Sequence, residues 1–267
     1  NLSLYLIQLY KNKMNFPENI GGFFEYKKSV EKERPLLTTE PRLITIDGVD
    51  GSGKSTIAKK LFNKLQDVFG KDKIELASIT KLNRSPKQKR LGDITKKENI
   101  TGLRLENFYI AGVNRAYEEV IIPALREGKI VLVDRSEIDL LRYALWRGDK
   151  ESAKKRGEYI KDGTATHRLW AGNRIFLESN ANAALKNLEN RDHKSLDDPT
   201  SLEEVKSNIS AQKEAEKQIE TLPHQGNIKI TREKVVRIED ELEREKYLND
   251  LAEKLFANLD LSAENIK

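Results

Sequence analysis

Short runs of apolar and β-branched residues alternate with longer stretches in which apolar positions recur every three or four residues. The short runs are typical of strands buried on both faces, and we expect five: 43–46, 74–79, 129–134, 174–178 and 228–230. The longer stretches have the period of amphipathic helices and lie at about 57–69, 103–127, 137–147, 181–190, 201–220 and 240–258. Strand–helix alternation predicts right-handed crossovers and a parallel sheet that helices cover on both sides.

The predicted fold class is therefore α/β, a doubly wound, five-stranded parallel sheet. Residues 1–38 fall outside the alternating pattern, and we expect an N-terminal extension there and one domain over residues 39–267. The stretch RDHKSLDDPTS, residues 191–201, lies between two predicted helices and is the best candidate for a mobile loop. The cation-rich stretch 153–161 predicts a solvated helix in an insertion, with an acceptor or RNA contact as the less favoured alternative. Trp146 and Trp170 are expected to be packing anchors for this insertion rather than base stackers.

A glycine-rich stretch, ITIDGVDGSGKST, follows the first predicted strand and precedes an amphipathic helix. It fits the phosphate-binding pattern G-x-x-x-x-G-K-[ST] at every fixed position. Glycines let consecutive backbone N–H groups wrap a di- or triphosphate above the positive end of the helix. Lys54 is predicted to reach the β and γ phosphates, and Ser55 to ligate Mg²⁺. The predicted nucleotide contacts are Gly48, Val49, Asp50, Gly51, Ser52, Gly53, Lys54, Ser55 and Thr56.

The third predicted strand ends in VLVDR, with Asp134 followed by Arg135. A carboxylate at that place can order magnesium, whereas a cation after it suits an acceptor or a transferring phosphoryl group better than it suits water activation. No N-K-x-D string, with which GTP switches read guanine, occurs in the chain. These features favour a kinase of a small molecule over a GTP switch or a hydrolytic motor.

Composition and net charge limit the kinds of ligand and metal site that the chain can have. The net charge of +5 and the pI of about 9.1 favour anionic ligands such as nucleotides, but the lysines are spread among nearly as many acids, which argues against nucleic acid. The chain has no cysteine, which excludes disulfides and thiolate metal sites. No run approaches 18 apolar residues, and the apolar start lacks a cleavage site, so we expect no membrane span and a cytoplasmic location. Because the only methionine is Met14, we expect the first residues to be an upstream reading or a fragment boundary.

The glycine loop, together with EEVIIPALREGKIVLVDRS further along, resembles the thymidylate kinases, which are P-loop nucleoside-monophosphate kinases. The stretch RIFLE followed by NANAALKNLENR resembles their fourth strand, helix and lid, which puts the lid at about 190–202. The resemblance covers roughly residues 40–260. It implies P-loop kinase topology with a helical lid, and transfer of the γ-phosphoryl group of ATP, with Mg²⁺, to a nucleoside monophosphate, dTMP first. It also implies a candidate homodimer, because thymidylate kinases pair through helices.

The resemblance also implies roles for single residues. Asp50 matches the acidic residue that binds the 3′-hydroxyl of the acceptor sugar. Asp134 and Arg135 match the family's Asp-Arg motif, near magnesium and at the acceptor phosphate respectively. Arg115 resembles the arginine that meets the acceptor from the long helix, and Arg191 would be the lid arginine.

The composition of the phosphate loop supports the catalytic role that the resemblance implies for Arg191. Family members with glycine rather than arginine in that loop, as here at Gly51, supply the catalytic arginine from the lid. The implied catalytic residues are therefore Lys54, Arg135 and Arg191.

The acceptor half departs from the family pattern. The lid reads LDDPTS where a second Asp-Arg pair is usual, and the T-R-E-P string after the second strand is absent. The family places a base-stacking aromatic four residues before the acceptor arginine, and counting back from Arg115 gives Ala111. Aligning on IIPAL instead puts Tyr109 at the stacking place but Val113 at the arginine's. Both alignments can hold only with a short deletion in this helix.

Two other interpretations stay open. Deoxynucleoside kinases share the P-loop fold and use a carboxylate-Arg-Ser trio, here Asp134-Arg135-Ser136, to accept the proton of a sugar 5′-hydroxyl. Alternatively, the chain is a non-catalytic nucleotide-binding P-loop module whose acceptor site has been lost. The arginines at 115, 135 and 191 favour the monophosphate kinase, because two sets of phosphates must be neutralised there.

Overall fold

The computed structural model describes residues 37–79, 103–163, 167, 169–191 and 198–261. All belong to the second of two units of the chain, Leu36–Lys267. Most of the expected N-terminal extension, residues 1–38, and most of the expected mobile loop, residues 191–201, lie outside the described ranges.

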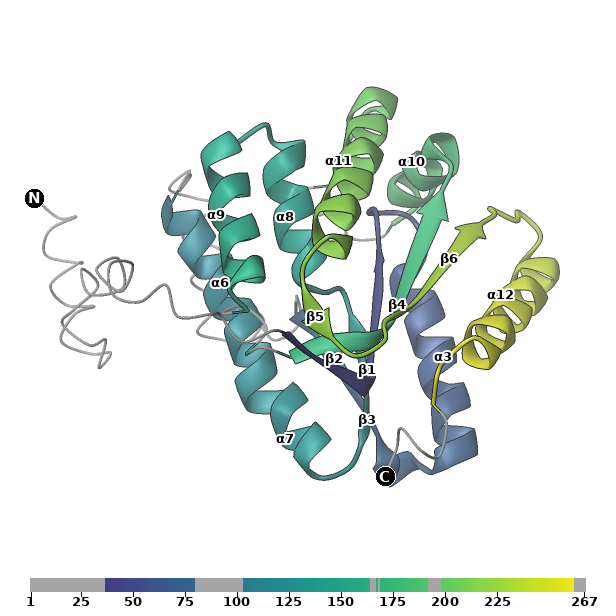
Figure 1. Cartoon of the computed structure of the whole chain (residues 1–267). Coiled ribbons are helices and arrows are strands. Elements are labelled where there is room, and N and C mark those ends of the chain that lie inside the picture. Colours follow the sequence, from purple (N-terminus) through teal and green to yellow (C-terminus); the bar gives the residue numbers. More distant parts are fainter. Residues whose placement is uncertain (1–36, 80–102, 164–166, 168, 192–197, 262–267) are drawn as a thin grey trace, which may run out of the picture. The chain divides into compact units, whose positions relative to one another are not determined.

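Five parallel strands lie side by side in the order β2-β3-β1-β4-β6 (Figure 1). They are β1 (Leu37–Gly48), β2 (Ile74–Ser78), β3 (Ile130–Asp134), β4 (Leu169–Ser179) and β6 (Lys229–Val235). A two-residue strand, β5 (His224–Gln225), pairs with the start of β1. The predicted fold class, a five-stranded parallel sheet with helices, is confirmed. The β1 and β4 strands start earlier than predicted, because Thr38–Glu40 of β1 pair in register with Leu169–Ala171 of β4.

Helices cover both faces of this sheet. The helices are α3 (Lys54–Phe69), α6 (Leu103–Ala116), α7 (Ile122–Arg126), α8 (Glu137–Trp146), α9 (Lys150–Lys161), α10 (Ala181–Glu189), α11 (Leu202–Glu220) and α12 (Glu241–Ala257). In Figure 1, α3 and α12 lie on one side of the sheet, and α6, α8, α9 and α11 lie on the other.

The central strand β1 sends apolar side chains to both layers. Ile44 and Ile46 are fully buried in a cluster with residues of α3 and α12, whereas Leu43 is buried in a cluster with residues of α6 and α7. Side chains of a strand alternate between the two faces, so a strand covered on both sides needs a continuous apolar run. This burial fixes β1 and therefore the position of the loop that follows it.

The helix predicted over residues 103–127 contains a wide turn. Between α6 and α7 the chain forms a π-helical segment, η2 (Tyr117–Ile121), in which the amide of Ile122 donates to the carbonyl of Tyr117, five residues back. Pro123 follows and has no N–H for an α-helical bond. A π turn inserts about one extra residue and rotates the side chains beyond it. The two conflicting family alignments of this helix diverge across this turn.

The predicted helix at 153–161 forms as α9, but it is not solvated all round. The side chain of Arg156 is 1% exposed and donates to the carbonyl of Leu140 on α8. Trp170 is also buried, as expected of a packing anchor. The prediction of a solvated helix was wrong at Arg156, because sequence alone does not show which cation lies under a neighbouring helix.

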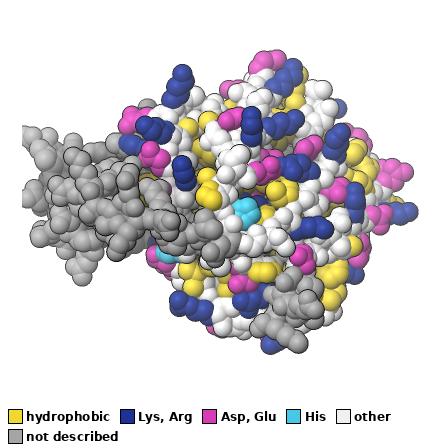
Figure 2. All heavy atoms as spheres, in the orientation of Figure 1, with side chains coloured by type: hydrophobic (Ala, Val, Ile, Leu, Met, Phe, Trp, Pro, Cys, Tyr) yellow, Lys and Arg dark blue, Asp and Glu magenta, His cyan; other side chains and the backbone are white. Residues whose placement is uncertain are grey.

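On the face shown in Figure 2, Lys and Arg side chains are interspersed with Asp and Glu, and the described residues form no stripe of one sign there. Among the described residues, no helix is both long and apolar enough to cross a membrane.

Candidate functional site

The glycine loop joins β1 to α3 at the carboxyl end of the central strand. Gly51 has φ 84°, and a Cβ built on it would lie 2.3 Å from the carbonyl oxygen of Ala184 on α10. Both the left-handed backbone and this close approach require glycine. The loop is therefore packed against α10 as well as against the start of α3.

Lys54, the first residue of α3, is folded back over the loop. Its side chain is buried, and Nζ donates to the carbonyl oxygens of Gly48 at 2.5 Å and Val49 at 2.7 Å. Burial, and then the nearby charge of Arg135, lower its pKa from 10.5 to about 8. The ammonium is thus held at the mouth of the loop, where a polyphosphate would meet it.

Ser55 and Asp134 meet beside the loop. The Ser55 hydroxyl donates to Oδ2 of Asp134 at 2.9 Å, while Oδ1 of Asp134 is buried and has no hydrogen-bond partner. A cavity of about 260 Å³ opens here and is lined by both residues and by Ser78 at the end of β2. A hydroxyl and a carboxylate are the hard oxygen ligands that Mg²⁺ prefers, and Mg²⁺ usually takes its remaining ligands from water and phosphates. Among the described residues, no group of three or more His, Cys, Asp or Glu side chains is placed to hold a metal ion.

Arg135, the next residue, turns the other way. Its φ of 75° is left-handed, and its backbone amide donates to the carbonyl of Ile46 at 3.0 Å. The guanidinium donates to Oδ1 of Asp50 at 2.6 Å and to Oδ2 of Asp139 at 2.8 Å. A bulky residue with positive φ is strained, and such strain persists where the surroundings hold it. Here it brings Arg135 to the phosphate-loop carboxylate of Asp50.

Helix α8 supplies a second arginine to Asp50. Arg142 is fully buried and donates to Oδ2 of Asp50 at 3.3 Å and to Oδ1 of Asp139 at 3.0 Å. The hydroxyl of Tyr143 donates to Oδ2 of Asp50 at 2.8 Å, and Arg142 also donates to Asn208 on α11. Burial alone would raise the pKa of Asp50, but Arg142 and then Arg135 hold it well below its usual value. Both oxygens of Asp50 are therefore committed to internal donors.

Below this cluster, Asp47 at the end of β1 is fully buried. It accepts from the backbone amide of Ser136 at 2.8 Å and from the Ser136 hydroxyl at 2.8 and 2.9 Å. Burial raises the pKa of Asp47 to about 7, and the nearby carboxylates of Asp139 and Glu137 add to the effect. Ser136 also caps the start of α8 by accepting from the amide of Ile138. These bonds tie the end of β1 to the start of α8 and so hold Arg135 between them.

The structure does not bring every predicted site residue to this place. Arg115 is 41% exposed and pairs at 2.8 Å with Glu119 of the following π-helical segment η2. Arg191 is 39% exposed and pairs at 3.3 Å with Asp198, an acid of the LDDPTS stretch. Tyr109 belongs to α6, but its side chain lies outside the described part of the structure. The roles of these three residues stay predictions.

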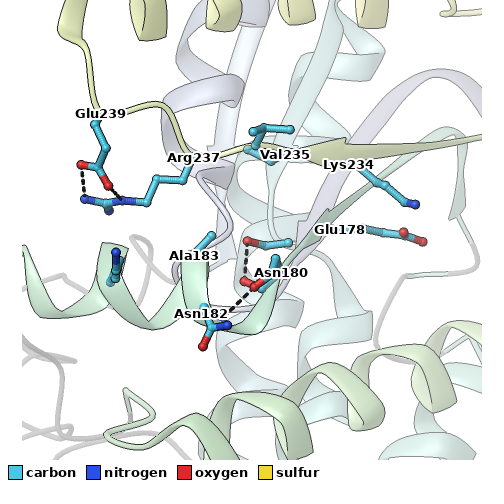
Figure 3. Close-up of a pocket in the computed structure, with 11 residues that line it drawn as sticks. Glu178, Asn180, Asn182, Ala183, Lys234, Val235, Arg237 and Glu239 are labelled. Atoms are coloured by element: carbon cyan, nitrogen blue, oxygen red, sulfur yellow. Dashed lines mark hydrogen bonds and ion pairs between the residues drawn. The ribbon is translucent and has the colours of Figure 1, made fainter.

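A larger cavity of about 640 Å³ opens on the other side of the loop (Figure 3). It lies between the ends of β4 and β6, the start of α10 and the segment after β6. A Cβ on Gly53 would lie 3.8 Å from Val235, which lines the cavity, so the cavity adjoins the phosphate loop. No motif in the sequence indicated its lining residues, because they come from two separate stretches of the chain, 178–186 and 234–239.

Four residues of the Asp50 network were not predicted from the sequence: Asp139, Arg142, Tyr143 and Asn208. The first three follow Arg135 by four, seven and eight residues, so one face of a helix carries them. That spacing was a usable signal. No local pattern indicated Asn208, which reaches the cluster from α11.

Residues 46–235 match the family model described as Thymidylate kinase. The curated relatives include the thymidylate kinase of Finegoldia magna, 39% identical over 103 residues, which are 38% of this chain and 49% of that protein. The thymidylate kinase of Halothermothrix orenii is 33% identical over 129 residues, 45% of this chain and 58% of that protein. The chain thus spans about half the length of the curated relatives it matches.

Solved structures of the same family resemble the fold. Thymidylate kinase from Ehrlichia chaffeensis aligns with a TM-score of 0.56 at 14% identity, covering 82% of this chain and 99% of that chain. Thymidylate kinase from Candida albicans aligns with a TM-score of 0.54 at 17% identity, covering 84% of this chain and 93% of that chain. At these identities the likeness shows the fold.

Proposed function

Because the chain belongs to the thymidylate kinase family, we propose that it transfers the γ-phosphoryl group of ATP to a nucleoside monophosphate, with dTMP as the first candidate. One observation carries the proposal. Asp134 and Arg135 are consecutive, yet they contact opposite ends of the phosphate loop, Asp134 at Ser55 and Arg135 at Asp50. A phosphotransferase needs this arrangement, with a metal ligand on the donor and a cation on the acceptor.

The donor would lie along the loop. The backbone amides at the start of α3 and the Lys54 ammonium would hold its phosphates, and the 640 Å³ cavity would take its base. Ser55 and Asp134 would hold Mg²⁺, since Oδ1 of Asp134 is a buried oxygen without a partner. When bound, Mg²⁺ supplies charge neutralisation on the phosphate oxygens.

The acceptor would approach the Arg135 end. A monophosphate already carries a charged oxygen as nucleophile, so this reaction needs positive charge rather than a general base. Asp139 and Asp50 are both paired with Arg135 and Arg142. Burial would raise the pKa of Asp139, but Arg142 and Arg135 lower it. Carboxylates held as ions by arginines are poor proton acceptors, so neither Asp50 nor Asp139 offers a general base at the Arg135 end.

The proposal includes the predicted roles of the outlying residues. Arg115 would orient the acceptor, Arg191 would close over the transferring phosphoryl group, and Tyr109 would stack on the acceptor base. Arg115 and Arg191 are paired with Glu119 and Asp198, so joining the site means leaving these partners. A homodimer and a cytoplasmic location also stay predictions.

The test is ADP release with ATP and Mg²⁺ against dTMP, dUMP, the other monophosphates, thymidine and deoxycytidine. The proposal expects turnover with a monophosphate, dTMP first, and none with the nucleosides. Turnover with a nucleoside alone would replace it with a deoxynucleoside kinase. Binding of ATP without turnover on any acceptor would make the chain a nucleotide-binding module.

A further inference from the structure

Asn187 on α10 connects the phosphate loop to the wall of the large cavity. Its side-chain nitrogen, Nδ2, donates to the carbonyl oxygen of Gly51 at 2.8 Å. Its side-chain oxygen, Oδ1, accepts from Nη1 of Arg237 at 2.5 Å. Arg237 lines the cavity beside Glu239, as Figure 3 shows. One amide thus joins the loop that would hold the phosphates to the cavity that would hold the base.

The chemistry of its neighbours fixes which way the Asn187 amide faces. A carbonyl oxygen only accepts hydrogen bonds and a guanidinium only donates them, so the amide nitrogen must point to Gly51 and the oxygen to Arg237. Arg237 is itself held, since its Nε and Nη2 donate to the two oxygens of Glu239 at 2.8 and 3.0 Å. The order is therefore Glu239, Arg237, Asn187, Gly51, with each group orienting the next.

The bond to Gly51 acts on the shape of the loop. The Gly51 carbonyl points out to Asn187, and the amide of the same peptide, that of Ser52, donates back to the carbonyl of Val49 at 3.1 Å. Holding the carbonyl outward keeps this tight turn closed. Gly51 has no side chain of its own to pack, so these two hydrogen bonds hold the orientation of its peptide.

We propose that Asn187 is a positioning residue for the phosphate loop and that Arg237 orients it, so that the base cavity and the phosphate site act as one unit. The inference rests on the proposed function only in taking the donor to be a nucleotide. It predicts that Arg237 affects the binding of a polyphosphate that has no base at all.

The experiment measures dissociation constants for ADP, tripolyphosphate and adenosine by calorimetry, in the full chain and in the variants Asn187→Ala, Arg237→Ala and the double variant. We expect Asn187→Ala to weaken ADP and tripolyphosphate about five- to ten-fold and to leave adenosine within two-fold. Arg237→Ala should weaken tripolyphosphate two- to five-fold in the wild-type background and not at all in the Asn187→Ala background.

Two further variants distinguish a specific loss of polyphosphate binding from a loss of folding. Asn227 is exposed and precedes β6, at the opposite end of that strand from the cavity, so Asn227→Ala should bind all three probes like the wild type. Asn187→Asp keeps the size of the side chain but turns a carboxylate oxygen toward the Gly51 carbonyl. It should weaken tripolyphosphate at least as much as Asn187→Ala.

Three results would overturn the inference: ADP affinity within two-fold of wild type in Asn187→Ala, equal losses for adenosine and tripolyphosphate, or additive effects of the two alanine variants. A wild-type chain that binds no ADP would instead overturn the proposed function, together with this inference.

Discussion

The two ends of the phosphate loop differ in how their charged groups are held. We call the contact of Ser55 with Asp134 the donor end, and the contact of Asp50 with Arg135 the acceptor end. Lys54 adjoins both ends, because its ammonium is held by the backbone carbonyls of Gly48 and Val49 and lies 4.0 Å from Oδ1 of Asp50. At the donor end, Asp134 keeps one buried oxygen without a partner. At the acceptor end, both oxygens of Asp50 are bonded to Arg135, Arg142 and Tyr143. The donor end therefore has an unpaired carboxylate oxygen that can bind a metal ion, whereas at the acceptor end each carboxylate oxygen of Asp50 already has a protein partner.

The difference shows how each end would work. A donor can add its oxygens to a site that is already shaped. A sugar hydroxyl that binds Asp50, as the family resemblance implies, would join a buried carboxylate that already accepts from Arg135, Arg142 and Tyr143. Networks of buried charges are stabilising only when every member is paired. Removing one residue of the acceptor end should therefore lower the stability of the fold. Removing one residue of the donor end should instead lower turnover.

The largest expected effect is on stability. Arg142→Met removes the fully buried arginine that pairs with both Asp50 and Asp139, and we expect it to lower the free energy of unfolding by about 3–5 kcal/mol. Urea denaturation at neutral pH measures this. Arg126→Met, at an exposed arginine that ends α7, should change it by less than about 0.5 kcal/mol. A decrease in the free energy of unfolding of less than about 1 kcal/mol in Arg142→Met would mean that Asp50 and Asp139 do not depend on Arg142 for their stability.

At the donor end, the effect should appear in turnover. Lys54→Ala removes the ammonium that would meet the β and γ phosphates, and we expect turnover to fall roughly 100- to 1,000-fold, about 3–4 kcal/mol. Lys59→Ala, at an exposed lysine on the same helix, serves as the control and should stay near wild type. Initial rates of ADP release with ATP, Mg²⁺ and dTMP measure both. Retention of turnover within a few-fold would remove Lys54 from the mechanism.

A third effect depends on pH. The pKa of Asp47 is raised from 3.8 to about 7, so the folded chain binds this proton more tightly than the unfolded chain. That contribution to stability is complete below about pH 4 and is lost as pH rises through 7. Between pH 5 and 8 we therefore expect the free energy of unfolding of the wild type to fall by about 2 kcal/mol relative to that of Asp47→Asn. Urea titrations of both proteins at several pH values measure the difference. Parallel pH profiles would show that Asp47 titrates normally.

The smallest effect isolates the backbone at Arg135. Arg135→Gly and Arg135→Ala remove the same ion pairs, but only glycine adopts φ 75° without strain. Arg135→Gly should therefore be more stable than Arg135→Ala by about 1 kcal/mol, although both should lose activity. Thermal unfolding of the pair measures this. Equal stability would show that the residue relaxes from the left-handed region when its ion pairs are gone.

The same contrast explains what could be predicted from the sequence. The donor end is encoded within one short stretch and the end of one strand, because a phosphate loop depends on local backbone geometry. Its predicted pair, Ser55 and Asp134, lies in contact. The strands β1 to β4 were also predictable from their apolar runs. The edge strand β6 has no buried residue, and only its first two residues, Lys229 and Ile230, lie in the predicted range 228–230.

The acceptor end depends on tertiary packing. The helical spacing places Arg142 on one face with Asp139 and Tyr143, but it does not show that this face packs against Asp50, and Asn208 reaches Arg142 from 66 residues away. The π-helical turn at Tyr117–Ile121 shifts the side chains of the long helix, and a periodicity of 3.6 residues does not reveal such a shift. Packing between helices, rather than a motif, determines which charges meet Asp50.

The most direct test compares Asp134→Asn with Arg135→Met in one experiment that measures the apparent affinities for Mg²⁺·ATP and for dTMP. The account predicts a split: Asp134→Asn weakens Mg²⁺·ATP at least ten-fold and leaves dTMP within about two-fold, and Arg135→Met does the reverse. Equal losses of both ligands in both variants would contradict the division of the phosphate loop into a donor end and an acceptor end.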